Sequence, residues 1–240
     1  MNRSLARLRP LLTAMSSSTS SKLAEFSTCE ISDALIKLKL PHGGHIPDIQ
    51  MLSPTDPAFR VCGPAYTVKM VLASDTNAPK PSAHFVDTAL AGHVVVIDAP
   101  PEVKSAVWGG LMSAGAQARS ATSVVISGRC RDLSEHRALG FPVFARGHST
   151  LGQSPFTRPS TVNIPLTIKP QGSGADTFAP VTIEPGDWIV ADVDGVVCVP
   201  RALEERVLEL AEKGRKVDAL CMEDIKAGNG VQNSFKLHRG

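Results

Sequence analysis

Two short apolar runs with a small-residue segment between them constrain the fold of this chain more than any other feature. The runs are residues 93–97 (HVVVI) and 123–127 (SVVIS), and residues 108–119 (WGGLMSAGAQAR) lie between them. Such runs are typical of buried strands, and the segment between them is typical of a helix that packs closely. This order predicts a strand–helix–strand unit with parallel pairing.

Other periodic segments surround this unit. Residues 184–200 (EPGDWIVADVDGVVCVP) predict a hairpin that turns at Asp194-Gly195. The D-x-D-G sequence there is similar to the start of a calcium loop, but the later ligands are missing, so we interpret it as a turn. Residues 147–180 are rich in Pro, Gly, Ser and Thr and predict an edge element or a subunit-contacting arm. Further helices are predicted at 22–39, 82–90 and 203–227, and further strands at 60–72, 141–144 and 162–168.

Composition excludes several classes of protein. The 240 residues are 42% hydrophobic, which is enough for a substantial core. A net charge of +2 is too small to indicate a nucleic-acid or anionic-membrane partner. No apolar run reaches the roughly 18 residues that a membrane span needs. The five cysteines are widely spaced and form no C-x-x-C pair, so we interpret them as reduced, intracellular thiols.

The N-terminal segment, residues 1–20, is rich in Arg and Ser and has no acidic residue. This composition fits a mitochondrial transit peptide, a floppy polar tail, or an extension before a true start at Met15. We therefore exclude residues 1–20 from the fold and assign one domain to residues 21–240. The expected location is cytoplasmic, or mitochondrial if residues 1–20 act as a transit peptide.

Charged side chains cluster where the second apolar run ends. Arg129, Arg131, Asp132 and Glu135 follow within eight residues of Ser127. One interpretation is a structural ion-pair network at the surface. The other is a site that handles charge, in which Arg131 holds a carboxylate with two parallel bonds and Asp132 binds Mg²⁺ or Mn²⁺.

Gly109 and Gly110 begin the helix of the parallel unit. The first N–H groups of a helix lack internal partners, and glycines allow an anion to approach them closely. Tight helix–sheet packing would also explain two glycines. Because this helix start and Arg131-Asp132 both follow the carboxyl ends of neighbouring strands, we expect them to converge. Together they are suited to a 2-oxo acid held against a divalent cation.

Two further chemistries remain open from the residues. His42 and His45 (HGGH) are spaced as metal ligands on a helix, but they stand in a Pro/Gly loop. Lys69 on a predicted strand, or Lys104 near the strand end, would serve a lyase that forms an imine with its substrate.

A longer pattern is similar to a known family. Gly110 is followed by twenty residues, then Arg131-Asp132, then two residues, then Glu135. Four other stretches match, namely residues 31–35 (ISDAL), 63–68 (GPAYTV), 140–147 (GFPVFARG) and 185–200. Over about residues 22–230 the chain resembles the RraA-like family, which includes 4-hydroxy-4-methyl-2-oxoglutarate aldolases that also decarboxylate oxaloacetate.

The resemblance implies a fold and an assembly. The fold is a single-domain α/β/β/α sandwich of the swivelling phosphohistidine-domain type, with mixed sheets. The protomers form trimers or pairs of trimers, with sites at subunit clefts. The resemblance also admits a non-catalytic alternative, a regulator that binds and inhibits a ribonuclease.

The resemblance also implies a site. Arg131 grips the carboxylate of a pyruvate moiety, Asp132 holds Mg²⁺ or Mn²⁺ among waters, and Glu135 orients the water that acts as a base. The amides that bind the pyruvate moiety are those of Gly109, Gly110, Leu111 and Met112. Residues 147–180 align poorly with bacterial members, so the substrate within this class stays open.

Overall fold

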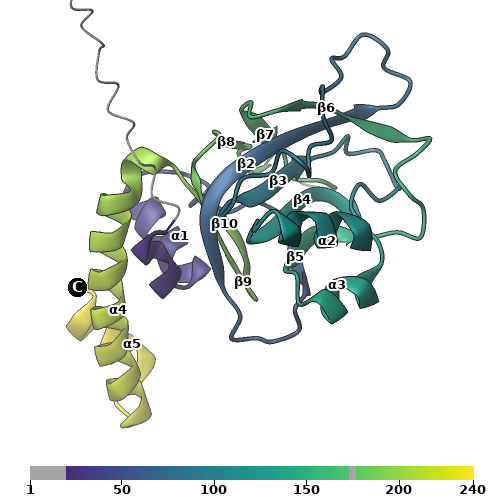
Figure 1. The fold of residues 1–240 in the computed structure, drawn as a ribbon. Coiled ribbons are helices and arrows are strands. Elements are labelled where there is room, and N and C mark those ends of the chain that lie inside the picture. The colour runs from purple at the N-terminus through teal and green to yellow at the C-terminus, as the bar shows by residue number, and fades with distance from the viewer. Residues whose placement is uncertain (1–19, 173–176) are drawn as a thin grey trace, which may run out of the picture.

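A mixed sheet and a smaller antiparallel sheet, which share one long strand, form the centre of the molecule, and helices cover the outer face of each (Figure 1). The computed structural model describes residues 20–172 and 177–240. The shared strand is β2 (Val61–Leu72). Its first half pairs antiparallel with β9 (Trp188–Asp192), and its second half pairs parallel with β3 (Val94–Asp98). The predicted tail or transit peptide lies outside the described residues except for Ser20.

The larger sheet contains the predicted parallel unit. Strands β2, β3, β4 (Ser123–Cys130) and β5 (Val143–His148) are parallel neighbours. Helix α2 (Gly110–Ala118) connects β3 to β4, and α3 (Leu133–Leu139) connects β4 to β5. The strand–helix–strand prediction is therefore confirmed. The edge strand β1 (Gln50–Ser53) and the short helix α3 were not predicted.

Successive side chains along each strand point to opposite faces of the sheet and so into different cores. Val94 and Val96 of β3 pack into the core between the two sheets, whereas Val95 and Ile97 pack under α2. In the smaller sheet, side chains of β9 and of β10 (Gly195–Val199) point alternately into the middle core and toward α1 (Thr28–Lys37) and α4 (Glu204–Lys226). Three cores between four layers confirm the predicted α/β/β/α sandwich.

Several predicted boundaries were wrong. The β9–β10 hairpin is present, but Gly195 pairs with Asp192, so the turn is Val193-Asp194. The predicted helix 22–39 is divided into a 3₁₀ turn, η1 (Lys22–Glu25), and α1. Ser27 separates them because its side chain accepts the Glu30 N–H at the start of α1, while the Glu30 side chain accepts the Ser27 N–H.

The predicted helix at 82–90 was also wrong. Residues 85–88 form a turn, and Phe85 is buried against the larger sheet. The Phe85 carbonyl accepts the Tyr66 hydroxyl at 3.1 Å and the Thr88 hydroxyl at 3.1 Å. Burial and tertiary hydrogen bonding therefore outweigh local helical spacing here.

The long segment 147–180 contains more structure than the one predicted strand, 162–168. It forms β6 (Thr157–Val162), which pairs antiparallel with the second half of β2, and then β7 (Leu166–Ile168). Strand β7 pairs with β8 (Val181–Ile183) in a separate two-stranded sheet. The segment is thus an edge element of the fold.

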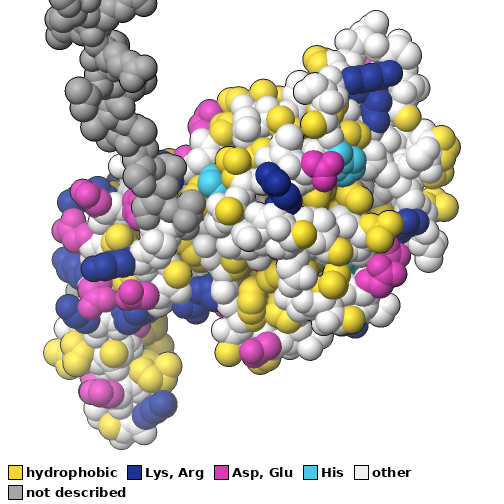
Figure 2. Space-filling view, in the orientation of Figure 1, with side chains coloured by type: hydrophobic (Ala, Val, Ile, Leu, Met, Phe, Trp, Pro, Cys, Tyr) yellow, Lys and Arg dark blue, Asp and Glu magenta, His cyan; other side chains and the backbone are white. Residues whose placement is uncertain are grey.

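The C-terminal region begins with a short 3₁₀ turn, η3 (Arg201–Leu203), and the long helix α4, which confirms the predicted helix at 203–227. A second helix, α5 (Val231–His238), was not predicted and packs back on α4. Charged side chains are concentrated over α1 and α4, whereas the side bearing α2 and α3 is mainly hydrophobic or uncharged (Figure 2).

Within the described residues, no helix is long and apolar enough to cross a membrane. All five cysteines are free, as predicted.

Candidate active site

The segment before α2 runs beside the end of β4. The Val107 N–H donates to the Arg129 carbonyl at 2.9 Å, and the Arg131 N–H donates to the Trp108 carbonyl at 2.9 Å. Strand β4 is longer than predicted and reaches Cys130, so this pairing continues its parallel ladder. The start of α2 is thereby placed directly against the residues that follow β4, as the sequence predicts.

Asp132 lies at the centre of this meeting point. It is the N-cap of α3 and has a left-handed backbone, with φ 62° and ψ 44°. Its Oδ2 accepts the Gly110 N–H at 3.0 Å and lies 3.4 Å from Arg131 Nε. The N-terminus of α2 therefore already holds a carboxylate, which shows that it suits an anion.

The two glycines make room for two carboxylates. A Cβ at Gly109 would lie 2.5 Å from Asp132 Oδ2, and a Cβ at Gly110 would overlap Glu135 Oε2. Any side chain at either position would displace an acidic group. The need for glycine thus comes from carboxylates that face the helix start as well as from close packing.

A cavity of about 190 Å³ opens at this point. It brings together five of the predicted residues: Gly109, Leu111, Met112, Arg131 and Asp132. Gly110 and Glu135 lie beside it, in contact with each other. The sequence did not predict five other lining residues, namely His84, Ala106, Val107, Trp108 and Gln153. His84 and Gln153 come from irregular segments, so no periodic signal marked them.

His84 is held in a defined orientation at the cavity. Its Nδ1 accepts the Val86 N–H at 3.3 Å, and its ring stacks on Phe85 with centroids 4.8 Å apart. The hydrogen bond to Nδ1 leaves the ring's second nitrogen as the atom that can meet a ligand. His84 therefore adds a polar group opposite the charged strand end.

The four charged residues at the end of β4 do not form one network. Among the described residues, Arg131 and Asp132 are the only two of the four in an ion pair with each other. Arg129 donates instead to the His148 carbonyl at 3.0 Å. It lines a separate cavity of about 320 Å³ together with Lys104. The structural ion-pair alternative therefore has little support in this geometry.

The other candidate chemistries are also placed elsewhere. Lys69 pairs with Asp98 at 2.5 Å, and neither Lys69 nor Lys104 lines the Arg131–Asp132 cavity. His42 Nδ1 accepts the Gly44 N–H at 2.9 Å, which is a turn contact. The residues of the imine and histidine–metal alternatives therefore lie outside the cavity at the charged strand end.

The carboxylates at this site suit a hard divalent cation that takes few of its ligands from the protein. The Asp132 side chain is 31% exposed, and Glu135 is exposed beside it. Within the described residues, no group of three or more His, Cys, Asp or Glu side chains is arranged to hold a metal ion. A cation here would therefore take most of its ligands from water or substrate, which is the usual manner of Mg²⁺.

Comparison with known proteins finds similar sequences and structures. A protein from Halalkalibacterium halodurans named "Putative 4-hydroxy-4-methyl-2-oxoglutarate aldolase" is 34% identical over 167 residues, covering 70% of this chain and 72% of that protein. The crystal structure of an uncharacterized protein from Pseudomonas syringae has a TM-score of 0.71 at 27% identity, covering 88% of this chain and 94% of that one.

A third likeness concerns the fold alone. Streptomyces coelicolor RraAS2, described as an unusual member of the RNase ES inhibitor RraA protein family, has a TM-score of 0.65 at 21% identity and covers 85% of this chain and 93% of that one. The family model described as Aldolase/RraA matches residues 28–198, which include every residue of the site. Because this match covers more than half of the chain, the chain belongs to the RraA-like family.

Proposed function

We propose that this chain is a divalent-metal-dependent carbon–carbon lyase. It cleaves 4-hydroxy-2-oxo acids, such as 4-hydroxy-4-methyl-2-oxoglutarate, to pyruvate, and it decarboxylates oxaloacetate. One observation carries the proposal: Arg131, Asp132 and the N-terminus of α2 line one small cavity. The names of the relatives support the same reaction class.

The residues divide the work by their chemistry. The Arg131 guanidinium binds the substrate carboxylate through a bidentate fork. The N–H groups at the start of α2 that Asp132 does not occupy hold the same end of the substrate, and the positive end of the helix dipole adds to this attraction. A cavity of about 190 Å³ accommodates the pyruvate end of the substrate, whereas the rest faces the cavity mouth.

Asp132 would hold the cation. When bound, a divalent cation supplies a positive charge that stabilises the negative charge developing on the 2-oxo oxygen. Glu135, against Gly110, positions the water that takes the proton of the C4 hydroxyl. Decarboxylation of oxaloacetate needs no such base, so the two reactions should depend differently on Glu135.

The test measures pyruvate release from both substrates. Activity should be lost with EDTA and return with Mg²⁺ or Mn²⁺. Asp132→Ala should abolish it while circular dichroism stays unchanged, and excess metal should not restore it. Asp56→Ala, in an exposed loop, is the matched control. The proposal is wrong if chelated enzyme and Asp132→Ala both keep wild-type turnover, and covalent trapping by borohydride would then favour an imine enzyme.

The second candidate function is a regulator that binds and inhibits a ribonuclease without catalysis. The fold likeness to Streptomyces coelicolor RraAS2 favours it. This function needs neither Arg131 nor Asp132. A folded chain that inhibits a ribonuclease and releases no pyruvate with Mg²⁺ or Mn²⁺ would support it.

A further inference from the structure

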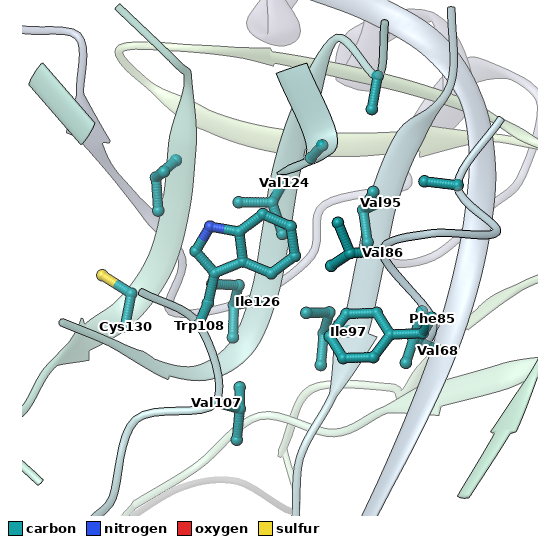
Figure 3. Close-up of a cluster of buried hydrophobic side chains, with 14 of the residues drawn as sticks. Val68, Phe85, Val86, Val95, Ile97, Val107, Trp108, Val124, Ile126 and Cys130 are labelled. Atoms are coloured by element: carbon teal, nitrogen blue, oxygen red, sulfur yellow. The ribbon is translucent and has the colours of Figure 1, made fainter. Parts of the chain in front are cut away.

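Three buried polar side chains form a hydrogen-bonded chain behind the site. Trp108 Nε1 donates to Ser113 Oγ at 2.8 Å, and Ser113 Oγ lies 2.9 Å from His136 Nδ1. Their exposed fractions are 2%, 0% and 0%. Trp108 lies among the apolar side chains of β4, with its indole nitrogen at one edge of the cluster (Figure 3).

The indole fixes one end of this set of contacts. An indole N–H can only donate, so Ser113 Oγ accepts it. The second hydrogen bond is donated by the Ser113 hydroxyl or by the His136 ring, according to the tautomer of His136. Burial lowers the pKa of His136 and favours the neutral ring, although the Arg131 backbone and nearby carboxylates act in the opposite direction.

His136 Nε2 itself is buried and has no hydrogen-bond partner among the described residues. The Arg131 backbone lies close enough to the ring to oppose the lowering of the pKa of His136 by burial. An unpaired polar atom in a core is costly, and an apolar residue would avoid that cost. What His136 supplies, and an apolar residue could not, is the hydrogen bond to Ser113 Oγ.

Direct catalysis is not the role of this hydrogen bond. A serine beside a histidine has the composition of a nucleophile and its base. Here both side chains are fully buried, and the serine oxygen already accepts a hydrogen bond from Trp108. A substrate in the cavity has no access to either atom.

The hydrogen bonds between Trp108, Ser113 and His136 instead join the two helix starts that make the site. The Ser113 N–H donates to the Gly109 carbonyl at 3.2 Å, and the His136 N–H donates to the Asp132 carbonyl at 3.2 Å. Each end of the Ser113–His136 bond is thus one helical turn away from a site residue. Trp108 ties the same bond to the strand-like segment before α2.

We propose that Trp108, Ser113 and His136 are positioning residues that hold the N-terminus of α2 at the distance from Asp132 which the reaction needs. The effect of these residues on the reaction rate rests on the proposed function. Their effect on structure does not, because it concerns only the hydrogen bond from the Gly110 N–H to Asp132 Oδ2.

Two variants interrupt this hydrogen-bonded series in different ways. Ser113→Ala removes its middle, and His136→Leu removes its far end, the ring that bonds Ser113 Oγ. His136→Asn is the conservative control, because its amide oxygen can stand near the position of Nδ1. The readouts are kcat/KM for oxaloacetate, hydrogen exchange of the Gly110 amide, the NMR signal of the Trp108 indole N–H, and the melting temperature.

We expect Ser113→Ala and His136→Leu to lower kcat/KM at least tenfold and to speed Gly110 exchange at least tenfold. Exchange in β3 and β4 should change less than threefold. The Trp108 indole signal should shift in Ser113→Ala. His136→Asn should stay within threefold of wild type in both readouts. The melting temperature reports general destabilisation, and a loss confined to Gly110 exchange with little change in β3 and β4 separates positioning from it.

Unchanged Gly110 exchange and kcat/KM in both folded variants would overturn the proposal. If His136→Leu fails to fold, Ser113→Ala with His136→Asn still decides it. If the wild-type chain releases no pyruvate with Mg²⁺ or Mn²⁺, the proposed lyase function fails. Gly110 exchange and the indole signal then decide the positioning role by themselves.

Discussion

At the scale of single residues, Arg131 and Arg129 make a matched pair. Both follow the same apolar run, but Arg131 lines the candidate cavity and Arg129 bonds the His148 carbonyl outside it. Lysine keeps the charge of arginine and loses the planar fork. We expect Arg131→Lys to weaken transition-state stabilisation by about 2–4 kcal/mol, measured as kcat/KM on oxaloacetate. Mn²⁺ affinity should survive in this variant.

Arg129→Lys is the control for that experiment, and it should change kcat/KM by less than about threefold. Equal losses in the two variants would mean that the loss does not come from the bidentate contact that Arg131 makes in the cavity.

Gly110 tests whether the carboxylate of Glu135 must lie against the helix start. A methyl group there would overlap Glu135 Oε2, so the carboxylate has to move. We expect Gly110→Ala to lower aldol cleavage at least tenfold and oxaloacetate decarboxylation less, because the second reaction needs no base. Alanine favours a helix over glycine by about 1 kcal/mol, so the melting temperature should not fall far.

The control is Gly214→Ala in the middle of α4, where the new methyl group makes only an ordinary contact with Lys37. It should leave both activities unchanged. Equal losses of cleavage and decarboxylation in Gly110→Ala would contradict the separate role given to Glu135.

At the scale of elements, the sequence predicts best where one physical cause acts alone. Strands β3 and β4 are apolar runs buried on both faces, so burial alone specifies them. The charged residues that follow β4 were placed correctly because parallel strands share an edge. Residues 82–90 had helical spacing, but Tyr66 and Thr88 take the Phe85 carbonyl that a helix would use.

Parts of the site could not be predicted because they depend on contacts distant in sequence. The seven residues of α3 are too few to show a helical period, yet this helix positions Glu135 and His136. His84 and Gln153 reach the cavity from segments without regular structure. The Ser113–His136 contact joins residues 23 positions apart on two helices, and no local pattern encodes it.

The start of α1 gives a prediction about pH. Arg215 Nε lies 2.6 Å from Glu30 Oε1, and the Glu30 carboxylate also accepts the Ser27 N–H at 2.7 Å. The Arg215 hydrogen bond is the largest cause that lowers the pKa of Glu30 to about 2. Because this pKa is depressed, the contribution to stability is complete above the unfolded value of about 4.3. It is lost as pH falls toward 2.

We therefore expect Glu30→Gln to lower the free energy of unfolding by about 1–2 kcal/mol at pH 7, and the difference from wild type to shrink between pH 4.5 and 2. Urea titrations at several pH values measure this. Glu209→Gln, in an exposed pair with Arg206, should cost less than about 0.5 kcal/mol. A Glu30→Gln deficit that stays constant down to pH 2 would argue against the charge as its source.

At the scale of the whole molecule, the far end of α4 and α5 projects beyond the two sheets (Figure 1). It carries apolar side chains that are well exposed: Leu220, Met222, Val231, Phe235 and Leu237. Leu237 alone is 71% exposed. An apolar group of this size on a projecting element is typical of a protein contact. The candidate cavity is also shallow, and Leu111 at its edge is 79% exposed.

We predict that the chain is a trimer or hexamer in solution, and that the α4–α5 end contributes to its contacts. Light scattering at micromolar concentration should give a mass three or six times that of the 25.4 kDa protomer. Leu237→Asp should shift the assembly toward monomer and lower kcat/KM, because a neighbour is expected to deepen the cavity. Leu90→Asp, at another exposed leucine, should do neither. A fully active wild-type monomer would refute the assembly, and a Leu237→Asp trimer with normal mass would move its contacts to another face.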